Sequence, residues 1–172
     1  MKSYRRTVQV IIFMAVVLLG GYAIGNTLFA SDGVPRKGDK APEFTLLGLD
    51  GKVHKLSEYR GKPVIVNFWG SFCPECVTEM PAIESQFEKW KGKVDVLGVN
   101  LSEDPITVRS FVSNFDVKFP IILDKNKVTE KKYGLQAYPT TFFINEEGNI
   151  ADIFVGGMKE PDVEQRIAKM LE

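Results

Sequence analysis

Hydrophobic and polar positions alternate along most of the chain in a pattern that predicts strands followed by helices. Residues 63–69 (PVIVNFW) form an almost unbroken apolar run, typical of a strand buried on both faces, and we expect this strand at the centre of a sheet. From residue 73 to residue 91 apolar positions recur every three or four residues, which predicts a helix. Residues 94–101 and 105–115 repeat the strand and the helix, and this alternation predicts parallel strands with crossover connections.

The segments on either side of this core predict two antiparallel hairpins. Residues 44–49 and 53–56 flank Asp50-Gly51, a strong signal for a tight turn. The other expected elements are a helical turn at 57–61, a strand at 119–123, a short helix at 128–133, a second hairpin at 140–145 and 150–155, and a closing helix at 161–171. The chain therefore predicts an α/β fold, with a mixed central sheet flanked by helices and an N-terminal β-hairpin.

The first thirty residues have a different character. Lys2, Arg5 and Arg6 precede an uncharged run, in which residues 10–25 are apolar or glycine. About 20 helical residues, at roughly 1.5 Å each, cross a hydrocarbon core of about 30 Å. We expect residues 1–30 to be a cytoplasmic basic stub and one N-terminal transmembrane helix, a signal-anchor. Because short basic flanks stay in the cytoplasm, this single-pass anchor places the remaining chain on the extracytoplasmic side of the cell membrane.

Two other interpretations of this segment stay open. The same pattern serves in cleaved signal peptides, although residues 28–30 lack small residues at both usual cleavage positions and no cysteine follows to carry a lipid. A buried core helix is the second alternative. Either export signal places the domain outside the cytoplasm. Residues 31–36 are expected to be a polar tether, and residues 37–172 the globular domain.

Composition narrows the functional classes. The 172 residues suffice for one compact domain with an extension, and lysine plus arginine equals aspartate plus glutamate at 22 each. This balance gives no electrostatic reason to expect nucleic acid or another polyanion as a partner.

The chain has two cysteines, Cys73 and Cys76, at the predicted junction between a strand and a helix. Redox chemistry, a structural disulfide and a metal site are the three interpretations. A ring this small stabilises a fold least, and structural zinc takes four protein ligands. The single histidine, His54, lies in the first hairpin and is interpreted as a surface residue. Redox chemistry is favoured, and no metal site is expected.

Position in the helix predicts different roles for the two thiols. At a helix start, unpaired backbone N–H groups and the positive end of the dipole favour a thiolate. Cysteine pKa values there fall from about 8.5 to as low as about 3.5–7.5. We therefore predict that Cys73 is the attacking sulfur. Cys76, one turn further along, is predicted to be the resolving thiol that displaces a partner bound to Cys73.

Three motifs point to a known family: W-x-x-x-C-x-x-C from Trp69 to Cys76, Pro81 within the helix, and Pro139 in Ala-Tyr-Pro-Thr-Thr before the second hairpin. With these motifs, residues 38–171 resemble the thioredoxin superfamily, and within it the membrane-anchored ResA/TlpA type of extracytoplasmic thiol-disulfide oxidoreductase. The resemblance implies a thioredoxin-like fold, and we expect the enzyme to need no cofactor.

The resemblance also implies roles for residues outside the dithiol. Pro139 is expected to follow a cis peptide bond, and the backbone of Tyr138 to face the dithiol and pair with a bound polypeptide; a simple loop before an edge strand is the alternative. Glu79 matches an active-site carboxylate, and partial burial would raise its pKa so that it passes the proton of Cys76. Its alternative is a surface acid.

Two departures from the family pattern concern the site. Asn67 stands where cytoplasmic thioredoxins have a buried aspartate. The ring carries Pro74 and Glu75, in the order Cys-Pro-Glu-Cys, where similar proteins usually have Cys-Glu-Pro-Cys. Pro74 fixes a helical φ, whereas the Glu75 carboxylate opposes a nearby thiolate. The sequence leaves the direction of the redox reaction open.

The resemblance implies that the enzyme reduces disulfides in exported proteins. The expected substrate is the haem-binding Cys-x-x-Cys-His of apocytochrome c, in cytochrome c maturation, with electrons from a membrane dithiol donor and the enzyme acting as a monomer. Alternatives are disulfide reduction in envelope or spore assembly, a thiol peroxidase, whose Pro-x-x-x-Thr-x-x-Cys pattern is absent, and a copper chaperone using Met80. Trp69, Phe72 and Tyr138 are candidates for an apolar rim around the dithiol, with buried packing as the alternative.

Overall fold

The computed structural model describes residue 9, residues 11–21 and residues 33–172, and the chain divides into two units, Met1–Gly33 and Val34–Glu172. In the first unit, residues 11–21 are helical. Over the described ranges, no helix combines the length and the apolar character needed to cross a membrane. The expected anchor includes positions 10 and 22–25, which lie outside the described residues. The anchor and the expected boundaries of the tether and the domain therefore stay predictions.

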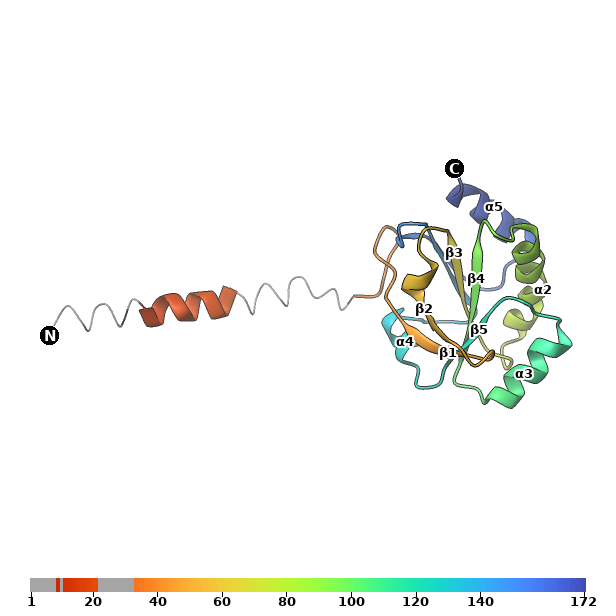
Figure 1. The fold of residues 1–172 in the computed structure, drawn as a ribbon, viewed down its shortest axis with the longest axis horizontal. Coiled ribbons are helices and arrows are strands. Elements are labelled where there is room, and N and C mark those ends of the chain that lie inside the picture. Colours follow the sequence, from red (N-terminus) through yellow and green to blue (C-terminus); the bar gives the residue numbers. More distant parts are fainter. Residues whose placement is uncertain (1–8, 10, 22–32) are drawn as a thin grey trace. The chain divides into compact units, whose positions relative to one another are not determined.

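A seven-stranded mixed sheet forms the centre of the second unit, in the strand order β2-β1-β5-β4-β3-β6-β7 (Figure 1). The neighbours β3, β4 and β5 are parallel, and β6 and β7 form an antiparallel hairpin beside β3. This arrangement confirms the predicted mixed sheet. The strands are β1 (Thr45–Gly48), β2 (Val53–Lys55), β3 (Val64–Trp69), β4 (Asp95–Leu101), β5 (Ile121–Asp124), β6 (Thr140–Ile144) and β7 (Ile150–Val155).

Strand β3 is buried along its whole length, as its apolar sequence predicts. It is one position from the middle of the sheet, however, and β4 is the central strand. The N-terminal hairpin accounts for this difference, because β1 pairs antiparallel with β5 through Leu47 and Leu123 and so adds two strands on that side. The local pattern predicted the hairpin itself, but not the strand that it joins.

The N-terminal hairpin corrects the interpretation of His54. Its side chain is almost fully buried, with 9% of the residue exposed. His54 Nδ1 lies 2.6 Å from the Tyr59 hydroxyl, and Nε2 lies 3.2 Å from Asp50 Oδ1. Tyr59 ends a short 3-10 helix, η1 (Leu56–Tyr59), that follows β2 directly and supplies this partner. The prediction of a surface histidine is therefore wrong.

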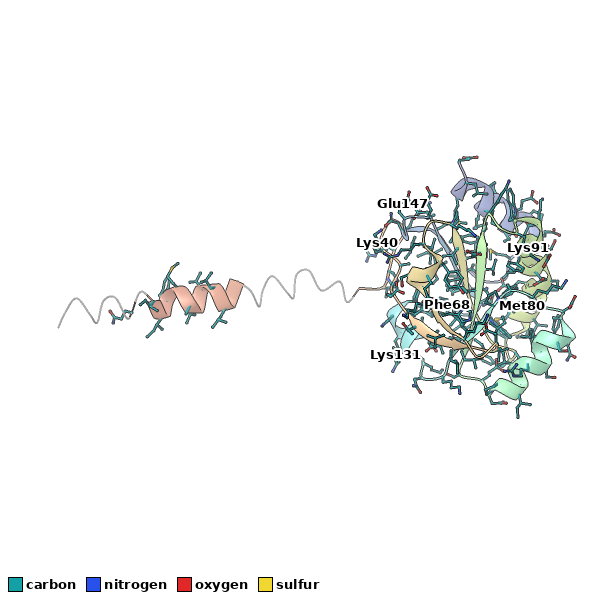
Figure 2. All side chains as sticks on the ribbon, in the orientation of Figure 1. Lys40, Phe68, Met80, Lys91, Lys131 and Glu147 are labelled. Atoms are coloured by element: carbon teal, nitrogen blue, oxygen red, sulfur yellow. A yellow bond between two sulfur atoms is a disulfide. The ribbon has the colours of Figure 1, made fainter. Side chains whose placement is uncertain are left out.

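Helices cover both faces of the sheet, as Figure 1 shows. They are α2 (Pro74–Lys89), α3 (Pro105–Asn114), α4 (Val128–Lys132) and α5 (Glu160–Met170). Alternate residues of β3 point into two hydrophobic clusters, one under α2, α3 and α5 and one on the opposite face. Met80 belongs to the first cluster and Phe68 to the second; both are labelled in Figure 2. The parallel strands and α2 between them fix the place where the cysteines lie.

Candidate active site

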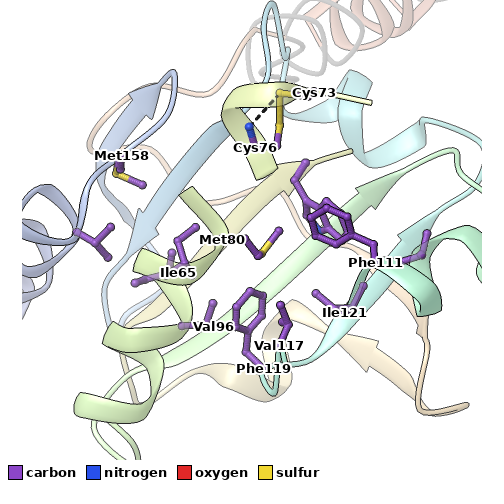
Figure 3. Packing of buried hydrophobic residues seen from close by; sticks show 14 of the residues in the cluster. Ile65, Cys73, Cys76, Met80, Val96, Phe111, Val117, Phe119, Ile121 and Met158 are labelled. Atoms are coloured by element: carbon purple, nitrogen blue, oxygen red, sulfur yellow. Dashed lines mark hydrogen bonds between the residues drawn. A yellow bond between two sulfur atoms is a disulfide. The ribbon is translucent and has the colours of Figure 1, made fainter. Parts of the chain in front are cut away.

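The two cysteines form a disulfide at the first turn of α2, with their Cα atoms 5.3 Å apart. Cys73 is the residue that caps the helix, and Pro74 occupies the first helical position, where its fixed φ suits the helix. The Cys76 backbone N–H donates to Cys73 Sγ at 3.2 Å, shown as a dashed line in Figure 3. Cys73 retains 8% exposure, whereas Cys76 is fully buried. Both cysteines are therefore buried in the disulfide form, and Cys73, which caps the helix, is the one that keeps some contact with solvent.

Glu79 lies one turn beyond Cys76 and is 1% exposed, so it is not a surface acid. Its Oε1 accepts a hydrogen bond from Asn67 Nδ2 (2.8 Å), and its Oε2 accepts one from the Met158 backbone N–H (3.1 Å). Burial raises the pKa of Glu79 to about 7, and the negative charge of Glu75 adds to the rise, although the two hydrogen bonds oppose it. The carboxyl group can therefore take up or release a proton near neutral pH.

Asn67 links Glu79 to the sheet. It is buried on β3, and its Nδ2 also donates to Thr141 Oγ1 of β6 at 2.9 Å. Its Oδ1 is buried without a hydrogen-bond partner in the part of the chain that the structure describes. A neutral amide thus occupies the place of the aspartate of cytoplasmic thioredoxins, and Glu79 is the ionisable group that it orients.

The loop before β6 lies beside the start of α2. The Tyr138–Pro139 peptide bond is cis, as the resemblance implies. The Tyr138 ring lies 6.2 Å from the ring of Phe72, the residue before Cys73. The Tyr138 hydroxyl donates to Glu130 Oε1 at 2.6 Å, and burial together with this bond raises the pKa of Tyr138 to about 12. Within residues 33–172, no backbone–backbone hydrogen bond uses the N–H or the carbonyl of Tyr138.

The first turn of α2 also carries the two unusual ring residues, both exposed. Gly157, in the loop between β7 and α5, packs closely on Glu75: a Cβ atom built on this glycine would lie 3.4 Å from the Glu75 Cβ and carbonyl oxygen. The next residue, Met158, bonds to Glu79. One loop therefore touches both the exposed and the buried glutamate.

Comparison with known proteins decides the family. The family model described as Redoxin matches residues 36–169. The chain belongs to the Redoxin family. Among curated relatives of this Redoxin protein, the thiol-disulfide oxidoreductase ResA of Halalkalibacterium halodurans is 36% identical over 165 residues, which cover 95% of this chain and 93% of the relative. ResA of Bacillus subtilis is 35% identical over 162 residues, covering 93% and 90%.

Solved structures give the same fold for this Redoxin domain. A putative thiol:disulfide interchange protein DsbE from Chlorobium tepidum superposes with a TM-score of 0.76 at 32% identity, over 80% of this chain and 99% of that one. StoA from Bacillus subtilis gives a TM-score of 0.65 at 27% identity, over 73% and 96%. The Redoxin protein is thus a thiol-disulfide oxidoreductase with a thioredoxin-like fold, as its motifs indicated.

The aromatic side chains of this Redoxin domain divide between rim and core. Phe72, the residue before Cys73, is 61% exposed and lies beside the Tyr138 ring. Trp69 is fully buried and packs on Phe111, with ring centroids 4.7 Å apart, so for Trp69 the alternative of buried packing holds and not a place in the rim. The cause is the alternation along β3: Trp69 shares a face with Ile65 and points into the cluster under α2 and α3, which Figure 3 shows around Phe111.

Among the described residues, no group of three or more His, Cys, Asp or Glu side chains could hold a metal ion. The thioether of Met80, the soft ligand considered for copper, is fully buried in the hydrophobic cluster beneath α2 (Figure 3).

Sequence reasoning missed a carboxylate next to the dithiol. Glu103, in the loop after β4, accepts hydrogen bonds from Ser71, two residues before Cys73, and from Asn100. The contact joins residues 32 positions apart. No local motif predicts such a pairing, and the one available hint was that the loops after parallel strands β3 and β4 meet at the same edge of a sheet.

Proposed function

We propose that this thiol-disulfide oxidoreductase is held at the outer face of the cell membrane by its N-terminal segment and reduces disulfides in exported proteins. The observation that carries the proposal is the Cys73–Cys76 disulfide at the start of α2, in which Cys73 caps the helix and is slightly exposed, whereas Cys76 is fully buried. A capping sulfur that accepts a backbone N–H is stabilised as a thiolate, which is the nucleophile in disulfide exchange.

The reaction transfers two electrons in two exchanges. The Cys73 thiolate attacks one sulfur of the substrate disulfide, that bond breaks, and the other substrate sulfur leaves as a thiolate. Cys76, once deprotonated, then attacks Cys73 Sγ. The bond between Cys73 and the substrate breaks, the second substrate sulfur departs as a thiolate, and a Cys73–Cys76 disulfide is formed. The substrate is reduced to two thiols, and the protein is oxidised. A membrane dithiol donor reverses this change in the protein and is itself oxidised.

Glu79 acts as the proton acceptor for Cys76 in this proposal. It follows Cys76 by one helical turn, and Asn67 and Met158 hold its two oxygens. Because its pKa is raised to about 7, Glu79 is a strong enough base to accept a thiol proton and a strong enough acid to return it.

The proposed substrate class is an extended segment with a pair of oxidised cysteines, such as the Cys-x-x-Cys-His of apocytochrome c. The backbone N–H and carbonyl of Tyr138, which make no backbone–backbone hydrogen bond within residues 33–172, would pair with such a segment as an added strand, and Phe72 would contact its apolar side chains. Disulfides of proteins in envelope or spore assembly fit the same surface.

Trapping the mixed disulfide tests the proposal. In cells that produce Cys76→Ser, the first exchange occurs but resolution does not, so the substrate stays bound to Cys73. We expect apocytochrome c in the trapped complex, identified by mass spectrometry, and no complex with Cys73→Ser. Envelope or spore proteins in its place would select the alternative substrate class. Many unrelated exported proteins would instead indicate a general oxidant or isomerase.

A further inference from the structure

A polar cluster next to the dithiol has no part in the mechanism above. The Glu103 carboxylate accepts three hydrogen bonds. Oε2 accepts from the Ser71 backbone N–H and from Asn100 Nδ2, each at 2.7 Å, and Oε1 accepts from the Ser71 hydroxyl. None of the ion pairs within residues 33–172 includes Glu103. This carboxylate is therefore held by neutral donors, two of which come from the turn that leads to Cys73.

Glu103 lies between two regular elements, the end of strand β4 and the start of helix α3. Asn100 is fully buried near the end of the central strand β4. Ser102 has a φ of +61°, a left-handed conformation that turns the chain sharply before Glu103. Asp104, the next residue, caps α3 by accepting two backbone N–H groups of its first turn. Glu103 therefore ties the turn at Ser71 to a central strand and to the start of a helix.

The turn that Glu103 holds sets the place of the attacking sulfur. The Cys73 N–H donates to the Gly70 carbonyl oxygen at 3.2 Å, which closes a tight turn over residues 70–73. The same residue caps α2, and its Sγ accepts the Cys76 N–H. A displaced turn would carry Sγ away from the N–H groups that stabilise a thiolate.

We propose that Glu103 is a positioning residue of the dithiol site: by holding Ser71 it fixes the turn at residues 70–73, and with it the orientation of Cys73 Sγ toward an incoming disulfide. The inference rests on the proposed dithiol chemistry. Glu103 acts through Ser71 and not on the reacting sulfur.

Positioning and simple charge repulsion predict opposite effects of Glu103→Gln. Removal of a negative charge near Cys73 would favour the thiolate and lower the Cys73 pKa. Weakening of the hydrogen bonds between Ser71 and Glu103 would move Cys73 Sγ from the helix N–H groups, raise the Cys73 pKa and slow the attack. Ser71→Ala removes the hydrogen bond from the Ser71 hydroxyl to Glu103 and leaves the Glu103 charge in place, so it separates the two effects.

The test is a stopped-flow measurement of the reaction of each reduced protein with the model disulfide 5,5′-dithiobis(2-nitrobenzoate), from about pH 5 to about pH 9. We expect Glu103→Gln and Ser71→Ala each to slow the attack roughly tenfold, as small misplacements of reacting groups do. Both should raise the midpoint of the pH–rate profile. The double variant should be no slower than the slower single variant, because the two residues form one contact. Glu147→Gln, at the turn between β6 and β7, is the matched control and should equal wild type.

Three results would overturn the inference: rates and midpoints equal to those of Glu147→Gln, a lowered midpoint in Glu103→Gln, or fully additive effects in the double variant. Circular dichroism and thermal melting show whether each variant folds. If Glu103→Gln does not fold, Ser71→Ala alone decides the question. A wild-type protein that fails to react would contradict the proposed function as well, whereas a reactive wild type with unaffected variants contradicts only the role of Glu103.

Discussion

At the scale of single residues, the site depends on the different positions and burial of three ionisable groups at the start of α2. Cys73 caps the helix, whereas Cys76 and Glu79 are buried one and two turns behind it. The exchanged order of Pro74 and Glu75 adds a feature of its own. Glu75 lies four positions before Glu79, on the same helix face, whereas the Cys-Glu-Pro-Cys order would place the carboxylate five positions before it. The exposed carboxylate thereby raises the pKa of the buried one.

Glu79 should make the stability of the oxidised protein depend on pH. Its pKa rises from an ordinary 4.5 to about 7 on folding, so its contribution to stability is complete below about pH 4.5 and is lost as the pH rises through about 7. Glu79→Gln removes this dependence. We expect the free energy of unfolding of the variant, relative to wild type, to rise between these pH values by up to about 3 kcal/mol. Urea denaturation of both oxidised proteins at each pH measures it.

The oxidised state is used because the cysteines then do not titrate, and other groups cancel in the difference between the two proteins. A difference that stays constant with pH would show that Glu79 is ionised throughout, and would remove it as a proton acceptor near neutral pH.

The placement of the site residues along a helix is easier to predict from the sequence than the residues that surround them. The spacing of Cys73, Cys76 and Glu79 on one helix follows from local periodicity alone. The burial of His54 is not evident from its hairpin alone, because it depends on the short helix η1, which brings the Tyr59 hydroxyl to the ring. The burial of Trp69 follows from the alternation along β3, whereas its contact with Phe111 of α3 does not. The hydrogen bonds between Ser71 and Glu103, which lie 32 positions apart, likewise leave no local pattern in the sequence.

At the scale of elements, short helices and turns support the site from both faces of the sheet. Helix α4 carries Glu130, which accepts the Tyr138 hydroxyl hydrogen bond next to the cis peptide bond. The start of α4 is held in turn by Asp124, a buried residue at the end of β5. Asp124 Oδ1 accepts the Val128 N–H at 3.1 Å, and Oδ2 accepts the Glu130 N–H at 2.8 Å. The loop before β6 is thus linked to the sheet through α4.

We expect Asp124→Ala to lower the free energy of unfolding by about 2 kcal/mol, because two N–H groups at the start of α4 lose a buried acceptor. Urea denaturation provides the measurement. Glu147→Ala, which removes an exposed carboxylate from the opposite edge of the sheet, is the control and should change stability by less than about 0.5 kcal/mol. Equal effects of the two substitutions would mean that Asp124 does not hold α4.

Strands and helices of the core were predictable because each carries its own periodicity. The apolar run of β3 and the spacing of α2 identify them without knowledge of their neighbours. The pairing of β1 with β5 was not predictable, because the sequence of a hairpin carries no pattern that identifies the strand with which it will pair.

At the scale of the whole molecule, the catalytic domain and the N-terminal segment have separate tasks in the proposed function. The domain supplies the chemistry, and the segment supplies the place where it occurs. The basic residues Lys2, Arg5 and Arg6 before the apolar run give the proposed orientation.

We expect the full chain to sediment with membranes and to resist extraction at high salt, because the apolar segment is held by hydrophobic burial and not by charge. A variant that begins at residue 37 and carries a cleavable export signal should be soluble outside the cytoplasm and keep its activity toward a model disulfide. Immunoblotting of the fractions measures both. If the product of the full-length gene instead appears in the soluble fraction, shortened by its N-terminal segment, a cleaved signal peptide would be indicated.

The central claim is that the fold makes Cys73 the acidic, attacking thiol and Cys76 its buried partner. The most direct measurement is the rate of alkylation by iodoacetamide as a function of pH in Cys76→Ser, which leaves Cys73, and in Cys73→Ser, which leaves Cys76. We expect the midpoint for Cys73 to lie well below the ordinary value of about 8.5, and Cys76 to react slowly with a midpoint above it. Equal midpoints near the ordinary value, or a more acidic and more reactive Cys76, would contradict the account.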